Sequence, residues 1–272
     1  MQGLRFALFV EGSVTQPSRG PSPLEAIWRD CLGEALALYR FNPIVPINKK
    51  HLVAMDPRKP RMSGGGEALD QLIVRMMKRT PFDAAVVAWD LVPAWNPEGA
   101  FCRWEETLDL YRFLAESESL PQQWKEQAAM RYSDLRRRPS PGTRKTPLRL
   151  EQGIVLPICM EPMFESLLTQ DEAAVRRALG VKKTPKGWPS RGWADPQTRR
   201  PDSEVLSPAI RSLFGIRPKP GVLRKIHGDM ITHKNEWGEL LLREMLADER
   251  AQAAILGHPI AVRLKELLSR NR

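Results

Sequence analysis

The chain has 272 residues, of which 42% are hydrophobic and 27% charged, a balance that is typical of a globular protein and excludes a fibrous or fully disordered chain. Its formal net charge of +10 favours a polyanionic partner, most often nucleic acid, although many basic proteins use such a charge only for solubility. No apolar run is long enough to span a membrane, and the three cysteines form neither a zinc motif nor a disulfide framework. We therefore expect a cytoplasmic protein with reduced thiols.

Four short apolar runs predict β-strands. The first run, LRFALFV, is almost continuously hydrophobic, as expected of a strand that is covered on both faces. The second is less regular because Pro46 lies within it. The four strands are expected over residues 4–10, 44–47, 84–89 and 154–159.

Between and after these runs, apolar residues recur at the spacing of amphipathic helices. Ser22 and Pro23 form a capping signal before the first of them. The basic, glycine-rich segment 48–66 is expected to be a loop. Helices are expected over residues 24–39, 67–78, 104–116, 122–132, 163–168, 171–179, 237–255 and 259–269.

The order of these elements predicts the fold class. Strands alternate with helices as far as the fourth strand, and this alternation predicts an α/β protein with a parallel-type sheet flanked by helices. The remainder of the chain is expected to be mainly helical. We therefore divide the chain into an α/β core over residues 1–165 and a helical C-terminal region over residues 166–272, which contains a basic loop with two tryptophans.

Acidic residues follow three of the predicted strands. Glu11, Asp90 and Glu161 each come at a strand end, and in a parallel sheet such ends lie along one edge. Glu165 follows Glu161 by four residues and would share its helix face. Clustered carboxylates without matching His or Cys suit Mg²⁺ or Mn²⁺. The alternative is that each acid caps a helix or pairs with one of the many Arg and Lys side chains.

Two of these motifs resemble a known family. FVEG at 9–12 and VVAWDLV at 86–92, with a helix between them, resemble the Toprim fold of topoisomerases, primases and OLD-family nucleases. ICMEPMFESLL at 158–168 and HPIAVRLKELL at 258–268 are similar to segments of small bacterial Toprim-like proteins of the RloB type. The resemblance covers the order of elements over most of the chain and implies a Toprim-like sheet.

The resemblance also implies roles for the acids. Glu11 matches the Toprim glutamate, a metal ligand or acid/base, and Asp90 matches the first aspartate of the Asp-x-Asp pair, a metal ligand. The second position of that pair is Val92, so the sequence departs from the pattern there. Either Glu161 and Glu165 supply the missing oxygens to Mg²⁺ or Mn²⁺, or the pocket is degenerate and binds without cutting.

Basic segments are the candidate nucleic-acid-binding surfaces. Lysine and arginine contact phosphates, and indole rings stack on unpaired bases. The alternative for the two tryptophans is that they anchor a long loop by packing inward. The candidate residues are Lys182, Lys183, Lys186, Trp188, Arg191, Trp193, Arg136, Arg137 and Arg138.

The expected function is therefore Mg²⁺-dependent cleavage of nucleic-acid phosphodiesters, with DNA favoured over RNA as the substrate. The resemblance implies a part in a bacterial anti-phage or mobile-element system and a separate ATPase partner, because this chain shows no ATP-binding motif of its own. The alternative, motivated by Val92, is a non-catalytic subunit that binds nucleic acid or a partner. A third possibility is an assembly component without a nucleic-acid role.

Overall fold

The structure is a computed structural model. It describes residues 5–12, 22–36, 41–53, 55, 67–90, 103–137, 154–160, 162–183, 200–214 and 234–269. By its internal contacts the chain forms two compact units. Unit 1 comprises residues 1–12, 39–159 and 266–272, and unit 2 comprises residues 13–38 and 160–265. This division differs from the predicted one, because residues 13–38 group with the C-terminal part of the chain.

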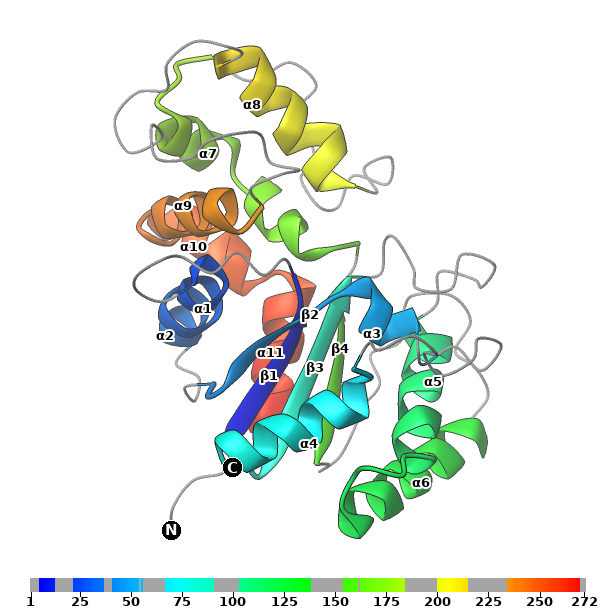
Figure 1. Cartoon of the computed structure of the whole chain (residues 1–272). Coiled ribbons are helices and arrows are strands. Elements are labelled where there is room, and N and C mark those ends of the chain that lie inside the picture. The colour runs from blue at the N-terminus through cyan, green and yellow to red at the C-terminus, as the bar shows by residue number, and fades with distance from the viewer. Residues whose placement is uncertain are drawn as a thin grey trace. The chain divides into compact units, whose positions relative to one another are not determined.

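Unit 1 contains a single four-stranded sheet. The strands are β1 (Phe6–Glu11), β2 (Ile44–Ile47), β3 (Ala84–Asp90) and β4 (Val155–Met160), in the order β2-β1-β3-β4. β1 pairs in parallel with both β2 and β3, and the arrowheads in Figure 1 point to one edge of the sheet. The predicted α/β class, with a parallel sheet flanked by helices, is confirmed.

The central strands are buried on both faces. Phe6 to Val10 of β1 and Ala85 to Trp89 of β3 are at most 1% exposed. Such burial explains why these runs carry apolar residues at successive positions instead of alternating polar and apolar ones. Phe82 lies edge-on between Phe9 and Trp124, and so joins the sheet to a helix.

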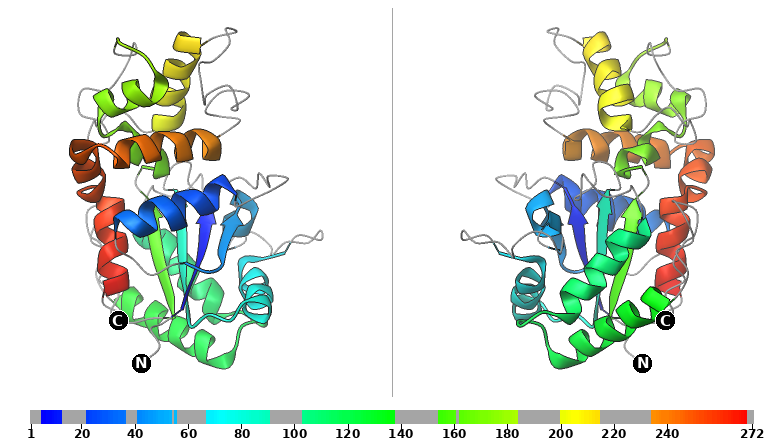
Figure 2. Two further views of the ribbon diagram at one scale, coloured as in Figure 1. Left: turned by 90° about the vertical axis from the view of Figure 1, so that its left-hand side faces the viewer. Right: turned by 90° about the vertical axis from the view of Figure 1, so that its right-hand side faces the viewer.

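Four of the described helices lie wholly within unit 1. They are α3 (Lys49–Val53), α4 (Leu69–Arg79), α5 (Arg103–Ala115) and α6 (Gln122–Arg137). α5 and α6 pack side by side (Figures 1 and 2). The Tyr111 hydroxyl of α5 donates to the Val155 carbonyl of β4 at 2.9 Å, and Ser117, just after α5, donates to Asp70 of α4 at 2.6 Å. These buried bonds tie α5 to both the sheet and α4.

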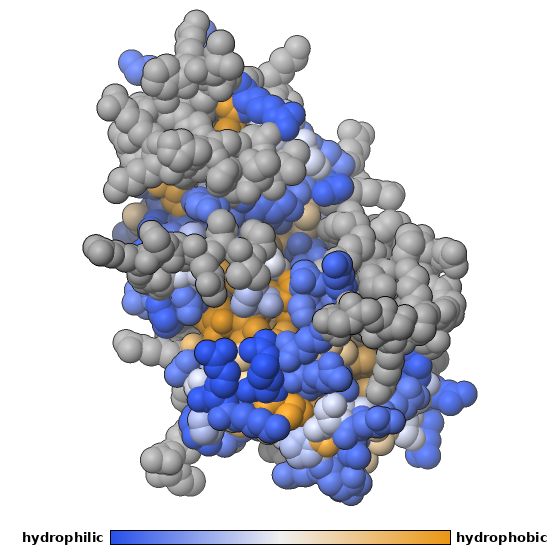
Figure 3. All heavy atoms as spheres, viewed as in Figure 1, coloured by the Kyte–Doolittle hydropathy of each residue, from blue (hydrophilic) through white to orange (hydrophobic). Residues whose placement is uncertain are grey.

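The outward face of α4 is hydrophilic. Gln71, Arg75, Lys78 and Arg79 are exposed on it, whereas Leu69, Leu72 and Ile73 are buried. Figure 3 shows this helix, at the lower centre of the view, as mainly blue. None of the helices within the described ranges combines the length and the hydropathy needed to cross a bilayer.

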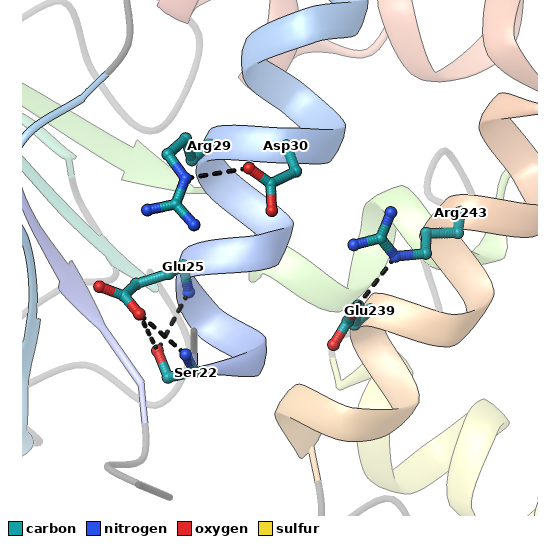
Figure 4. A network of polar contacts seen from close by, with 6 residues as sticks. All are labelled: Ser22, Glu25, Arg29, Asp30, Glu239 and Arg243. Carbon is teal, nitrogen blue, oxygen red and sulfur yellow. Dashed lines mark hydrogen bonds and ion pairs between the residues drawn. The ribbon is translucent and has the colours of Figure 1, made fainter. Parts of the chain in front are cut away.

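Unit 2 begins with a continuous helical segment made of α1 (Pro23–Glu25), η1 (Ala26–Leu32) and α2 (Gly33–Ala35). Ser22 and Glu25 form a reciprocal capping box at its start (Figure 4). The middle part, η1, is a π-helix, which the apolar spacing did not predict. A Cβ on Gly238 of α9 (Lys234–Leu246) would lie 3.3 Å from the Ile27 side chain, so glycine permits a close approach of these helices.

The rest of unit 2 is helical in its described parts. η2 is a 3₁₀-helix. The predicted single helix over 237–255 is wrong, because the structure has two helices there, α9 and α10. Asp248 caps the start of α10 by accepting a hydrogen bond from Ala251 N at 3.0 Å. Neither α3 of unit 1 nor η4 was predicted. The other elements are η2 (Phe164–Thr169), α7 (Glu172–Leu179), η4 (Pro201–Leu206), α8 (Ser207–Phe214), α10 (Glu249–Leu256) and α11 (Pro259–Ser269).

Candidate functional site

The carboxyl ends of β1 and β3 bring Glu11 and Asp90 together. The two strands pair in parallel as far as Val10 and Ala88, so Glu11 and Asp90 stand at the same edge of the sheet. Glu11 Oε2 accepts a hydrogen bond from the Asp90 backbone N at 3.0 Å. This bond holds the Glu11 carboxylate against the end of β3, at the edge where open parallel sheets bind their ligands.

A third carboxyl group, Glu106 of α5, lies beside this pair of strands and was not predicted. Its side chain is buried, with 4% of the residue exposed. Glu106 Oε2 accepts from the indole Nε1 of Trp89 at 2.8 Å and from the Cys159 thiol at 3.5 Å. Since Trp89 belongs to β3 and Cys159 to β4, three elements converge on this carboxyl group.

Burial raises the pKa of Glu106 to about 8. The hydrogen bonds from Trp89 and Cys159 favour the charged form and oppose this rise only in part. The negative charges of Glu11 and Asp109 raise the pKa further, so Glu11 and Glu106 lie within electrostatic reach of each other. Glu106 therefore carries a proton at neutral pH while Glu11 lies beside it.

The sequence contains a signal for Glu106 that the periodicity argument did not use. Glu106 precedes Leu110 by four residues and Leu114 by eight, so helical spacing puts it on the buried face of α5. Both leucines are fully buried, whereas Leu108 is only half-buried. A carboxyl group on the buried face of a helix is uncommon and is a reason to suspect function.

His51 of α3 is a further titratable group near this edge. β2 pairs with β1 up to the Glu11–Ile47 register, and α3 follows β2 directly, with Asn48 as its N-terminal cap. His51 Nδ1 accepts from Asn48 N at 3.0 Å, so the proton of the neutral imidazole is on Nε2. Burial lowers the pKa of His51. It is therefore a neutral hydrogen-bond donor in the helix that follows β2.

The two remaining predicted metal ligands are Glu161 and Glu165. Glu161 lies outside the described residues. Glu165 is 5% exposed in η2 of unit 2, with Oε1 3.5 Å from Lys234 Nζ. Because η2 begins at Phe164, the expected α-helical pairing of Glu161 with Glu165 does not hold. Burial and the charge of Asp202 raise the pKa of Glu165, whereas Lys234 lowers it.

Four of the predicted nucleic-acid-binding residues are described, and all four are exposed. Arg136 and Arg137 occupy the last turn of α6 in unit 1. Lys182 and Lys183 follow α7 in unit 2. The other five fall outside the described residues, so their predicted contacts stay predictions: Arg138, Lys186, Trp188, Arg191 and Trp193.

Within the described ranges, no three His, Cys, Asp or Glu side chains are grouped as ready metal ligands. Magnesium does not require three, because it commonly takes one or two carboxylates and completes its shell with water and substrate oxygens. Glu11 and Glu106 offer such oxygens, and Glu106 Oε1 is buried without a hydrogen-bond partner among the residues that the structure describes. The donor set at this edge therefore fits a hard divalent cation.

Comparisons with protein-family models, with curated protein sequences and with solved structures give no match for this chain. The function must therefore be argued from the site itself.

Proposed function

We propose that the protein cleaves nucleic-acid phosphodiesters in a reaction that depends on Mg²⁺ or Mn²⁺, with DNA as the preferred substrate. One observation carries the proposal: the Glu11 carboxylate is held at the carboxyl edge of a parallel sheet by the Asp90 N–H, beside the buried acid Glu106. A four-stranded parallel sheet flanked by helices is consistent with the Toprim-like fold that the motifs resemble.

Glu11 and Asp90 are the proposed ligands at this edge. A bound divalent cation supplies Lewis acidity, which polarises a phosphoryl oxygen and favours attack by water. Glu11 is oriented for this role, because the backbone N–H at the end of β3 fixes one of its oxygens. Glu11 is also the proposed acid/base, as the resemblance implies.

The basic surface supports the choice of a polyanionic substrate. Each lysine or arginine that contacts a phosphate releases counterions and strengthens binding at low salt. Arg136 and Arg137 in unit 1, and Lys182 and Lys183 in unit 2, are exposed as such contacts require. The positive net charge of +10 also attracts a negatively charged substrate. The proposal extends to a cytoplasmic role in bacterial anti-phage or mobile-element systems, with a separate ATPase.

A second candidate is a non-catalytic subunit that binds nucleic acid or a protein partner. Val92, where the Toprim pattern has an aspartate, favours this alternative, as does the lack of three grouped ligands among the described residues. Both candidate functions use the basic surface. They differ in whether the residues at the carboxyl edge of the sheet, Glu11 and Asp90, catalyse a reaction.

The test is cleavage of supercoiled plasmid and of single-stranded DNA and RNA, with Mg²⁺ or Mn²⁺, by the parent, Glu11→Gln and Asp90→Asn. Glu116→Gln is the matched control, since Glu116 is an exposed acid of unit 1 whose side chain is 59% accessible. We expect both site variants to lose cleavage while they still bind DNA at low salt, and the control to cut normally. A parent that binds but never cuts, even with its ATPase partner, supports the binding subunit instead.

A further inference from the structure

Glu106 differs from the other buried acids of the described residues. Asp70 accepts from the Ser117 hydroxyl, Asp171 caps α7 and pairs with Arg250, and Asp202 pairs with Lys234. Glu106 has neutral donors only, and both of them bind the same oxygen, Oε2.

The second oxygen, Glu106 Oε1, is buried and has no hydrogen-bond partner within the described part of the chain. A buried carboxyl oxygen without a partner is costly, because burial removes the water that would otherwise bind it. Glu165 Oε2 of unit 2 is also unmet among the described residues, but the other oxygen of Glu165 has Lys234 beside it. A ligand at Glu106 Oε1 would supply the missing partner. Glu11 indicates what kind of ligand this is. It lies within electrostatic reach of Glu106, and two negative carboxylates there repel each other unless a proton or a cation compensates them, so a cation is a ligand that fits both.

We propose that Glu106 is a further ligand of the divalent cation, which it holds together with Glu11. α5 thus supplies the oxygen that the position of Val92 lacks. Neither the composition nor the Toprim resemblance assigns a role to Glu106. The inference rests on the proposed function only for the location of the cation at the carboxyl edge of the sheet.

The surroundings of Glu106 fit this role. Trp89 and Cys159 fix Oε2 from two neighbouring strands and leave Oε1 as the oxygen that is available to a ligand. Glu11 is fixed in the same way, through Oε2 and the Asp90 N–H. Hydrogen bonds from an outer shell commonly orient carboxylate ligands in this manner. Two oriented carboxylates, with water and phosphate oxygens, make up the shell that Mg²⁺ prefers.

The test measures Mn²⁺ binding by the full chain, by electron paramagnetic resonance and by titration calorimetry, with no nucleic acid present. Glu106→Gln is nearly isosteric and keeps an acceptor for the Trp89 indole, while it removes the charge. We expect it to weaken Mn²⁺ binding at least about tenfold, and Glu11→Gln to do the same. The double variant should bind little more weakly than either single one, because both residues hold the same ion.

Glu116→Gln controls for the loss of one negative charge and should leave Mn²⁺ affinity unchanged. Circular dichroism and the urea midpoint verify that each variant is folded. Unchanged Mn²⁺ affinity in Glu106→Gln, or a parent that binds no Mn²⁺ at millimolar concentration, overturns the proposal.

The same experiment separates this inference from the nuclease proposal. If Mn²⁺ binding depends on Glu106 but the parent cuts no substrate, the cation site stands and the nuclease proposal fails. If the parent cuts and Glu106→Gln binds Mn²⁺ as tightly as the parent, the nuclease proposal stands and the role of Glu106 is refuted.

Discussion

Two buried glutamates, one in each unit, differ in the groups that compensate the burial of their carboxyl groups. Glu165 in unit 2 shares Lys234 with Asp202: Lys234 Nζ lies 2.5 Å from Asp202 Oδ2 and 3.5 Å from Glu165 Oε1. Glu106 in unit 1 has no such cation among the described residues and accepts only from an indole and a thiol. Both acids have a raised pKa, but among the described residues a cation of the chain lies only beside Glu165.

The difference separates a structural acid from a candidate functional one. The cluster of Glu165, Asp202 and Lys234 compensates its own charge in part and joins η2, η4 and α9 of unit 2. Although burial opposes the charge on Asp202, Lys234 lowers its pKa. The Glu106 environment is incomplete without a proton or a cation. A buried acid with its own lysine therefore belongs to the architecture, and one without is available for a ligand.

The largest effect expected of a single substitution at neutral pH comes from breaking the unit 2 cluster. Lys234→Met should lower the free energy of unfolding by about 3 kcal/mol, because it removes the cation beside the buried Glu165 and leaves Asp202 with the more distant Arg200, at 3.5 Å. Urea unfolding at pH 7, followed by circular dichroism, measures the change. Adding Asp202→Asn to the Lys234→Met variant should restore part of the lost stability. A single variant as stable as the parent contradicts the assignment of this cluster to the architecture.

In unit 1 the raised pKa of Glu106 predicts that the free energy of unfolding depends on pH. The pKa of Glu106 is about 8 in the folded protein and 4.5 in the unfolded chain, so between these values the folded state binds more protons. The stability due to Glu106 is therefore complete below pH 4.5 and falls as pH rises to 8, by about 1.4 kcal/mol per pH unit. Urea unfolding in EDTA from pH 5 to 8 should show a steeper decline for the parent than for Glu106→Gln.

Adding a divalent cation provides a second test of this pH dependence. If Glu106 binds Mn²⁺ as a carboxylate, millimolar Mn²⁺ should flatten the decline toward pH 8 in the parent and leave Glu106→Gln unchanged. Glu116→Gln should follow the parent in both conditions. A parent whose pH dependence equals that of Glu106→Gln in EDTA contradicts the protonated state of Glu106.

Local sequence patterns were sufficient for the sheet and for half of the site. Uninterrupted apolar runs located β1 and β3, and the acids directly after them, Glu11 and Asp90, share one edge because parallel strands end together. The spacing of apolar residues could not predict that η1 is a π-helix, since π-helical and α-helical turns have similar apolar patterns. The break before α10 depends on a single capping residue, Asp248, inside a run that is otherwise helical.

The other half of the site depends on contacts between distant residues. Glu106 is 95 residues from Glu11 in the chain, and only the packing of α5 against β3 and β4 relates them. Glu165 was a reasonable candidate by sequence, because it follows the fourth strand closely. Its partner Lys234 is 69 residues away, so no local pattern could indicate that this acid is paired.

His258 of unit 2 provides the smallest of the three predicted effects, and its sign is opposite to that of Glu106. Its Nε2 lies 3.1 Å from Ser166 Oγ, whose hydroxyl donates to Met163 O, while Nδ1 accepts from Ile260 N. The imidazole is therefore neutral, and since Ser166 and His258 are 0% exposed, the pair is structural and not a nucleophile with its base. Burial lowers the pKa of His258 from 6.5 to about 3.

Between pH 3 and 6.5 the unfolded chain therefore binds the proton that folded His258 excludes. Stability due to His258 is complete above pH 6.5 and is lost as pH falls, by about 1.4 kcal/mol per pH unit, or about 2 kcal/mol between pH 6.5 and 5. His258→Asn keeps a cap for α11 and removes the titration, so its urea midpoint should fall less steeply over that range than that of the parent. Equal acid slopes contradict the burial of a neutral imidazole. Opposite slopes in His258→Asn and Glu106→Gln would trace the acid loss to unit 2 and the alkaline loss to unit 1.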